Sequence, residues 1–164
     1  MLLLVITIGK ENFGIDISKV IEIVPIVKLE KIPKSPDYIA GYFNYRGEII
    51  PVMDISYLVS NKPSKLLLST RIIIMDYSDS LDKTYKIGFL AESLTETVTI
   101  NSSELSVPGI NLLDNSMKSG MILNEEQGMV YHLDLLKLLP LELINYIGQA
   151  SEKLSLMSSN LVTT

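Results

Sequence analysis

The sequence repeats itself, because two segments of its first half recur in the same order in its second half. Residues 14–24 match residues 88–98, with a glycine, a glutamate and a valine in register and apolar residues between them. Residues 41–58 and 120–138 then share a pattern of strand, turn, strand and a helical turn that an aspartate introduces. A repeat at a nearly constant sequence offset constrains the architecture more than any single predicted strand or helix does. We therefore expect two copies of one small unit.

Each copy is predicted to contain about five short strands and one helical turn. Runs of β-branched and aliphatic residues between glycine, proline or polar turns predict strands over residues 2–8, 13–17, 38–45, 49–53, 71–77, 85–91, 96–100, 120–123 and 129–133. Residues 18–23 fit a short helix or a continued strand. Such strand sets must close or stack to hide their edges, which favours small barrels. The predicted fold is mainly β, with short helices.

The length fits a single domain over about residues 1–150. The polar stretch 60–69 is the predicted joint between two lobes. Pro140 is acceptable as the first residue of a helix, and an apolar stripe follows it. The expected parts are a first lobe over about residues 10–68, a second over about 69–139, a C-terminal helix over about 140–150 and a flexible tail over 151–164.

The composition excludes several classes of function. A net charge of −5 without a basic run argues against a nucleic-acid partner. The absence of cysteine excludes disulfides, thiolate catalysis and cysteine zinc sites, and no glycine-rich phosphate loop is present. The apolar residues 1–8 lack the basic start of a signal peptide and are too short to span a membrane. We expect a cytoplasmic protein that binds other proteins, with no cofactor, no metal and no catalysis.

Three residues invite a catalytic reading, and each has a structural alternative. His132 alternates with its neighbours in a strand and has no second histidine to assist it, so we interpret it as a strand residue. Asp54 and Asp134 each follow a strand and precede a helical pattern. A carboxylate there accepts bonds from the first free N–H groups of a helix. We therefore interpret both aspartates as caps and not as an acid–base pair.

Arg46 is the residue with the sharpest functional interpretation. It lies at the tip of an apolar hairpin and is followed by Gly47. It is either a solvated turn residue or an arginine held against a carboxylate at a binding surface, a role that its planar, permanently charged fork suits. Glu22 is the candidate partner. The second copy keeps the acid as Glu96 but has no arginine in its turn, so we expect the function in the first copy.

Residues 40–54, AGYFNYRGEIIPVMD, resemble the signature of CheW-like chemotaxis coupling proteins, in which G-x-x-N-x-R-G leads into a strand ending P-V-x-D. Residues 20–23 resemble the family's V-x-E-I segment. Further pieces follow in the family's order, so that the resemblance covers about residues 2–148. Those pieces are residues 71–74, 88–90, 120–122 and 133–135.

The resemblance implies two five-stranded, SH3-like barrels without catalytic activity. It implies an adaptor that couples chemoreceptors to a sensor histidine kinase and binds the kinase's own CheW-like regulatory domain and the receptor's cytoplasmic tip. No receiver segment follows the signature, so the unfused type is expected. Tyr45 stands where the family usually has leucine, which bears on which partner fits. The residues implied to face a partner are Val20, Glu22, Gly41, Asn44, Arg46 and Gly47.

Two other functions stay open at this point. One is an adaptor of a chemotaxis-like system that controls surface (twitching) motility or another output. The other is a small-ligand-binding β-barrel, which would need a concave polar pocket and which the acidic charge disfavours. A partly buried carboxylate pair with raised pKa in one cleft would revive an enzyme.

Overall fold

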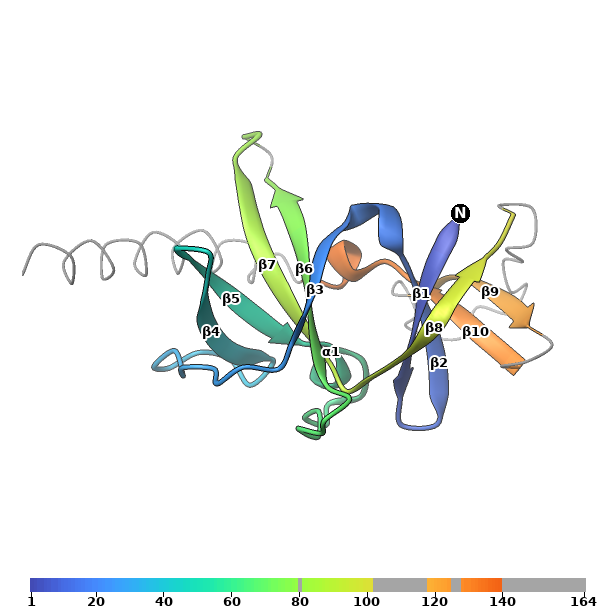
Figure 1. The fold of residues 1–164 in the computed structure, drawn as a ribbon, viewed down its shortest axis with the longest axis horizontal. Helices are drawn as coiled ribbons and strands as arrows, with labels where there is room; N and C mark the ends of the chain where they lie inside the picture. The colour runs from blue at the N-terminus through green and yellow to red at the C-terminus, as the bar shows by residue number, and fades with distance from the viewer. Residues whose placement is uncertain (80, 102–117, 125–127, 140–164) are drawn as a thin grey trace, which may run out of the picture.

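The computed structural model describes residues 1–79, 81–101, 118–124 and 128–139, with the backbone alone for 118–124. The described strands form two five-stranded sheets, so the predicted mainly β class is confirmed (Figure 1). The predicted C-terminal helix over 140–150 and the tail over 151–164 lie outside the described residues. No helix in the described ranges is long and apolar enough to cross a bilayer.

The two sheets have the same internal arrangement. Sheet I has the order β8-β1-β2-β10-β9, and sheet II has the order β3-β6-β7-β5-β4. The strands of sheet I are β1 (Leu2–Ile8), β2 (Glu11–Asp16), β8 (Ser93–Thr99), β9 (Lys118–Asn124) and β10 (Gly128–Leu133). Those of sheet II are β3 (Val20–Pro25), β4 (Ile39–Tyr45), β5 (Glu48–Asp54), β6 (Arg71–Ser78) and β7 (Thr84–Ala91). In the described ranges, three short helices accompany them, η1 (Ile17–Lys19), α1 (Ile55–Ser60) and η3 (Leu135–Leu138).

The two copies exchange strands, so that each sheet combines the first two strands of one copy with the last three strands of the other. The chain leaves sheet I through η1 to form β3, and it returns from β7 through Glu92 to form β8. Residues 60–69, the predicted joint, instead connect α1 to β6 beside the same sheet. The sheets therefore do not divide the chain at residue 68. The physical reason is that β1 and β6 each need an outer neighbour, which the other copy's third strand supplies.

The strand registers confirm the predicted repeat. The first strand of each copy is β1 or β6. One residue of that strand pairs with a glycine of the copy's second strand on one side and with a glutamate of the other copy's third strand on the other side. The two third strands, β8 and β3, also carry a register shift just before that glutamate. The paired residues are Val5 with Gly14 and Glu96 in sheet I, and Ile74 with Gly88 and Glu22 in sheet II.

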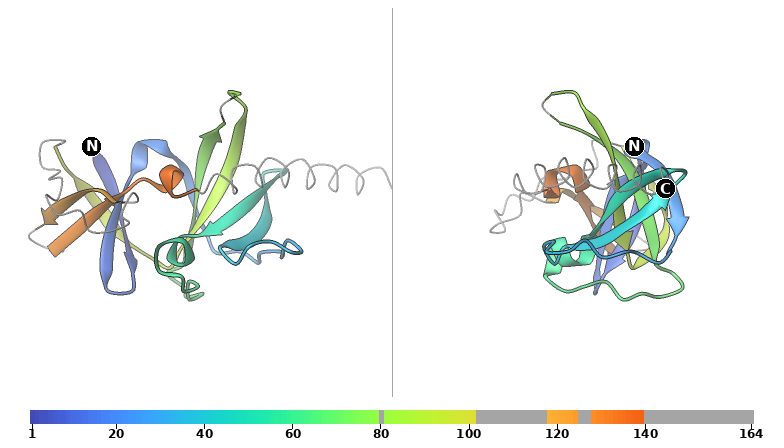
Figure 2. Two further views of the ribbon diagram at one scale, coloured as in Figure 1. Left: turned by 180° about the vertical axis from the view of Figure 1, so that it is seen from behind. Right: turned by 90° about the vertical axis from the view of Figure 1, so that its left-hand side faces the viewer.

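The main hydrophobic core lies between the two sheets. It joins Ile6 and Phe13 of sheet I to Ile73 and Phe89 of sheet II, and residues of η3 complete it. The η3 helix lies between the two lobes in Figure 1 and in the left view of Figure 2. Sheet II buries its opposite face in a second cluster that includes Ile72. Coverage on both faces explains why β6 reads as an unbroken apolar run rather than an alternating one.

The repeated glycine has a packing role in both sheets. A Cβ at Gly88 would lie 2.9 Å from Ile72 Cγ2 and 3.0 Å from Val52 Cγ2, both on fully buried β-branched side chains. A Cβ at Gly14 would lie 2.8 Å from Leu3 Cδ1, the far end of a flexible side chain. Stiff β-branched neighbours cannot rotate away as a leucine tip can.

We expect Gly88→Ala to lower the free energy of unfolding by about 1–3 kcal/mol through overpacking. We expect Gly14→Ala to cost roughly 1 kcal/mol or less, because Leu3 can change rotamer. Urea unfolding of the two variants beside the parent chain measures both costs. Equal costs, or a larger cost at Gly14, would contradict this account of the packing.

Candidate functional site

The β4–β5 hairpin ends in a tight turn at Arg46 and Gly47. Both residues have positive φ, +49° and +85°, as the two central residues of a type I′ turn require. The Asn44 side chain fixes the turn, because its Oδ1 accepts a hydrogen bond of 2.8 Å from the Gly47 N–H. The tip lies on the side of sheet II away from sheet I (Figures 1 and 2). Arg46 is thus held on a defined backbone at one end of the molecule.

The predicted pair of Glu22 with Arg46 is confirmed. Arg46 Nη2 lies 3.1 Å from Glu22 Oε2 and 3.4 Å from Glu22 Oε1. The Arg46 side chain is 74% exposed and that of Glu22 is 34% exposed. An ion pair with this exposure contributes little to stability, so its position at the surface is the informative feature.

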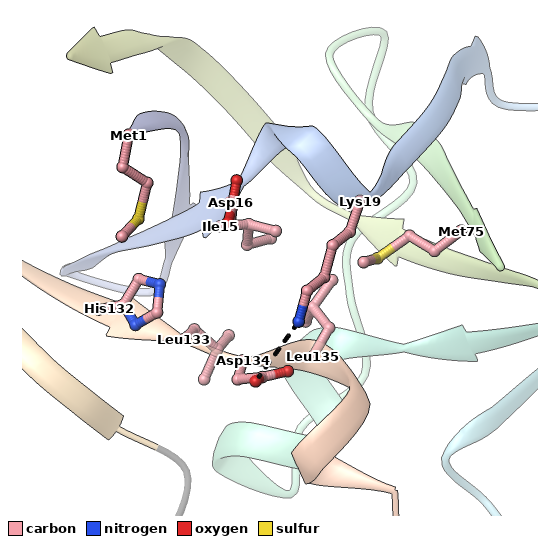
Figure 3. Close-up of a pocket in the computed structure, with 9 residues that line it drawn as sticks. All are labelled: Met1, Ile15, Asp16, Lys19, Met75, His132, Leu133, Asp134 and Leu135. Atoms are coloured by element: carbon pink, nitrogen blue, oxygen red, sulfur yellow. Dashed lines mark ion pairs between the residues drawn. The ribbon is translucent and has the colours of Figure 1, made fainter. Parts of the chain in front are cut away.

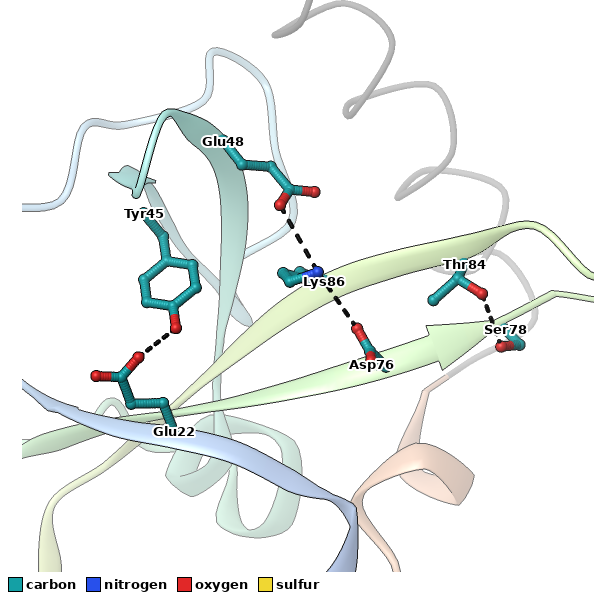
Figure 4. Close-up of polar contacts among 7 residues, drawn as sticks. All are labelled: Glu22, Tyr45, Glu48, Asp76, Ser78, Thr84 and Lys86. Atoms are coloured by element: carbon teal, nitrogen blue, oxygen red, sulfur yellow. Dashed lines mark hydrogen bonds and ion pairs between the residues drawn. The ribbon is translucent and has the colours of Figure 1, made fainter.

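Tyr45 is a third member of this site that the sequence interpretation missed. Its hydroxyl donates a hydrogen bond to Glu22 Oε2 (Figure 4), and its ring lies 5.3 Å from Arg46 Cζ. The hydrogen bond to the Glu22 carboxylate is the main reason that the pKa of the Tyr45 hydroxyl is raised. We call Glu22, Tyr45 and Arg46 the edge cluster. The signal available in the sequence is a tyrosine directly beside the turn arginine.

The edge cluster connects the two outermost strands of sheet II. Glu22 belongs to β3 and Tyr45 to β4, and these are the outermost strands in the sheet order. No backbone pairing between β3 and β4 occurs in the described residues, so side chains alone make this connection. A second polar group lies beside it, where Lys86 Nζ is 3.8 Å from Glu48 and 3.7 Å from Asp76 (Figure 4).

Two other residues expected at the partner surface have contacts elsewhere. Gly41 has a φ of +147°, and a Cβ there would collide with the carbonyl of Glu30. That close approach is needed because the backbones of Glu30 and Tyr42 exchange two hydrogen bonds of 2.9 Å. Val20 packs against the core between the sheets. The structure therefore groups Glu22 and Arg46, adds Asn44 and Gly47 through the turn, and places Val20 and Gly41 outside the group.

The second copy has the acid of the edge cluster without its cation. Glu96 occupies the position in β8 that Glu22 occupies in β3. The turn equivalent to Arg46–Gly47 falls at residues 125–127, which lie outside the described residues, and its sequence contains no arginine. Among the residues that the structure describes, the edge cluster lies in sheet II.

Asp54 and Asp134 are both N-caps. Asp54 Oδ1 accepts from the Tyr57 N–H at 3.4 Å, and the same carboxylate accepts from Ser64 N at 2.8 Å and Ser64 Oγ at 2.6 Å. Asp134 Oδ1 accepts from the Leu136 N–H at 3.1 Å. Capping uses these carboxylates, and it explains their equivalence in the two copies.

A small cavity lies between the sheets beside η1 and η3 (Figure 3). Lys19 Nζ lies 3.9 Å from Asp134 Oδ2 at its wall. Burial lowers the pKa of His132, and the nearby carboxylates of Asp134 and Asp16 oppose this effect. Nowhere in the described ranges do three His, Asp or Glu side chains gather as a metal site would require. The lining residues are Met1, Ile15, Asp16, Lys19, Met75, His132, Leu133, Asp134 and Leu135.

Comparison with known proteins gives one consistent match. Residues 2–142 match the sequence model of the CheW-like domain. The chemotaxis protein CheW of Helicobacter pylori is 28% identical over 66% of this chain, which spans 63% of that relative. The CheW of Bacillus subtilis is 24% identical over 80% of this chain and 82% of its own length. The crystal structure of the scaffolding protein TtCheW from Thermoanaerobacter tengcongensis superposes with a TM-score of 0.71 at 26% identity, covering 87% of this chain and 89% of that one.

The two N-caps, Asp54 and Asp134, should contribute unequally to the free energy of unfolding. We expect Asp54→Ala to lower the free energy of unfolding by about 2–4 kcal/mol, because it removes the α1 cap and leaves two Ser64 donors without their acceptor. Asp134→Ala should cost about 1 kcal/mol, the value of a single cap. Chemical unfolding of both variants measures the difference, and an equal loss would show that the Ser64 bonds contribute nothing.

The half-buried imidazole of His132 should make stability fall in mild acid. With its pKa lowered in the folded state, His132 takes up a proton in the unfolded chain first as pH falls. His132 therefore makes its full contribution to stability above its ordinary pKa of about 6.5. That contribution is lost as pH falls from about 6.5 toward the lower pKa that His132 has in the folded state. We expect unfolding midpoints to drop more between pH 7.5 and 5.5 for the parent chain than for His132→Asn. Parallel pH profiles would contradict this.

Proposed function

Because the chain belongs to the CheW-like domain family, we propose that it is a non-catalytic, cytoplasmic adaptor in chemotaxis-type signal transduction. It couples a chemoreceptor to a sensor histidine kinase. Its partners are the cytoplasmic tip of the receptor and the CheW-like regulatory domain of the kinase. The observation that carries the proposal is the Glu22–Arg46 pair, held at the exposed end of sheet II on a turn of fixed geometry.

The β4–β5 hairpin tip is the proposed receptor-binding surface. The type I′ turn and the Asn44 bond hold Arg46 in place before a partner arrives. A preorganised side chain loses less conformational entropy on binding, so more of its interaction energy contributes to affinity. In this account Gly41 and Val20 act indirectly, by fixing β4 and β3, and Glu22, Arg46 and Gly47 lie at the contact.

The kinase regulatory domain is proposed to bind a different surface, an apolar face with a polar rim on one of the two lobes. Separate surfaces are required because an adaptor holds both partners at once. The hairpin tip points away from sheet I, which leaves the sheet I end of the molecule accessible while the receptor is bound (Figures 1 and 2). Individual contacts of modest affinity become strong when many copies are linked in an array.

We expect Arg46→Ala to weaken binding of a receptor cytoplasmic fragment about tenfold or more, measured by titration calorimetry. Melting temperature should change little, since the ion pair is largely exposed. Lys28→Ala is the matched control, because it removes an exposed cation of the same lobe that pairs with Glu30 at 3.8 Å. Unchanged receptor binding by Arg46→Ala would overturn the assignment of this surface.

A further inference from the structure

The Glu22 carboxylate receives two donors within the edge cluster. Oε2 accepts from the Tyr45 hydroxyl and also lies 3.1 Å from Arg46 Nη2. Charge-assisted hydrogen bonds of this kind are stronger than neutral ones and fix the orientation of the carboxylate. The Tyr45 ring is largely buried and packs against Phe43 with centroids 6.4 Å apart in an edge-on geometry, so its hydroxyl is rigidly placed. Tyr45 therefore determines where the Glu22 charge lies.

The position of Glu22 in turn determines which nitrogen of the Arg46 guanidinium pairs with it. Both contacts between the two side chains involve Nη2. Nε and Nη1 of Arg46 make no hydrogen bond to any residue in the described part of the chain, and the side chain is 74% exposed. One face of the guanidinium is near the Tyr45 ring, at 5.3 Å from its centroid. The outward side of the fork stays available to a bound molecule.

We propose that Tyr45 is a positioning and specificity-determining residue of the partner site, which orients Glu22 so that Arg46 presents its outer donors to a carboxylate of the partner. The inference rests on the receptor-binding role proposed above and extends it to the chemistry of the ligand. A planar fork with free donors matches a carboxylate bidentately. The partner group recognised at the hairpin tip is then an Asp or Glu side chain.

A hydroxyl at position 45 is what distinguishes this arrangement. A leucine or phenylalanine there would fill similar apolar space in the sheet II cluster but would give Glu22 no donor. Glu22 would then have Arg46 as its one remaining donor in the edge cluster, and both side chains would have more conformational freedom. Tyr42, three residues earlier on β4, offers a comparison within the same strand, because its backbone and not its hydroxyl makes the contacts seen here.

The test measures binding of a chemoreceptor cytoplasmic fragment by calorimetry to the full chain and to Tyr45→Phe. We expect Tyr45→Phe to weaken binding about 3- to 10-fold, the usual effect of losing one such hydrogen bond. Tyr42→Phe, the matched control, should bind as the parent chain does. Thermal unfolding of each variant separates this effect from a loss of fold, since all titrations are made well below the melting temperature.

A double-mutant cycle tests the route of the effect. If Tyr45 acts through Glu22, then Tyr45→Phe should add no further loss in a Glu22→Ala background. Arg46→Lys should also weaken binding, because it keeps the charge and loses the fork. Acidic residues of the receptor tip are also neutralised one at a time. Substitution of one Asp or Glu should weaken binding to the parent chain and cause no further weakening of binding to Arg46→Lys.

The outcomes separate this inference from the proposed function. Full binding by Arg46→Ala would overturn the receptor-binding surface itself. Weak binding by Arg46→Ala together with unchanged binding by Tyr45→Phe would overturn the role of Tyr45 alone. An undiminished effect of Tyr45→Phe in the Glu22→Ala background would contradict positioning through Glu22. Receptor binding that is insensitive to every acidic substitution would contradict recognition of a carboxylate.

Discussion

The exchange of strands between the two copies is the constraint on which the rest of the structure depends. Because β3 pairs with β6 and β8 pairs with β1, each sheet joins the first two strands of one copy to the last three of the other, and neither is complete without both copies. The chain crosses between the sheets at η1 and at Glu92, and one shared core lies between the two sheets. The lobes are therefore parts of one cooperative unit rather than two independent barrels.

The same exchange creates the functional edge. It makes β3 the outer strand of sheet II, where Glu22 meets the tip of the β4–β5 hairpin across an opening that no backbone pairing closes in the described residues. Polar side chains that bridge two sheet edges are exposed to solvent on one side and fixed on the other. That combination suits recognition, since the groups are preorganised and still accessible. Sheet I keeps the acid as Glu96, and its corresponding turn has no arginine in the sequence, so the two copies share a scaffold and differ at this site.

Local sequence patterns were sufficient to predict much of this arrangement. Repeat units, strand runs, the caps at Asp54 and Asp134 and the Glu22–Arg46 pair all follow from residue type and position. The strand exchange was not predictable in this way, because residues 60–69 are polar enough to be a joint and nothing local shows that β6 pairs with β3. Tyr45 was missed for a related reason. Opposite charge indicates the pairing of Glu22 with Arg46, whereas a tyrosine hydroxyl carries no such signal, and no local pattern shows that the outer strands β3 and β4 approach each other.

As the proposed adaptor, the chain would hold a receptor and a kinase together, and reconstitution of the three proteins tests this. The kinase, a receptor cytoplasmic assembly and this chain are combined, and kinase autophosphorylation is followed with and without receptor. We expect receptor-dependent control of phosphorylation to require the chain, and the three components to sediment as one complex. Equal control without the chain, or two binary complexes that exclude each other, would contradict it.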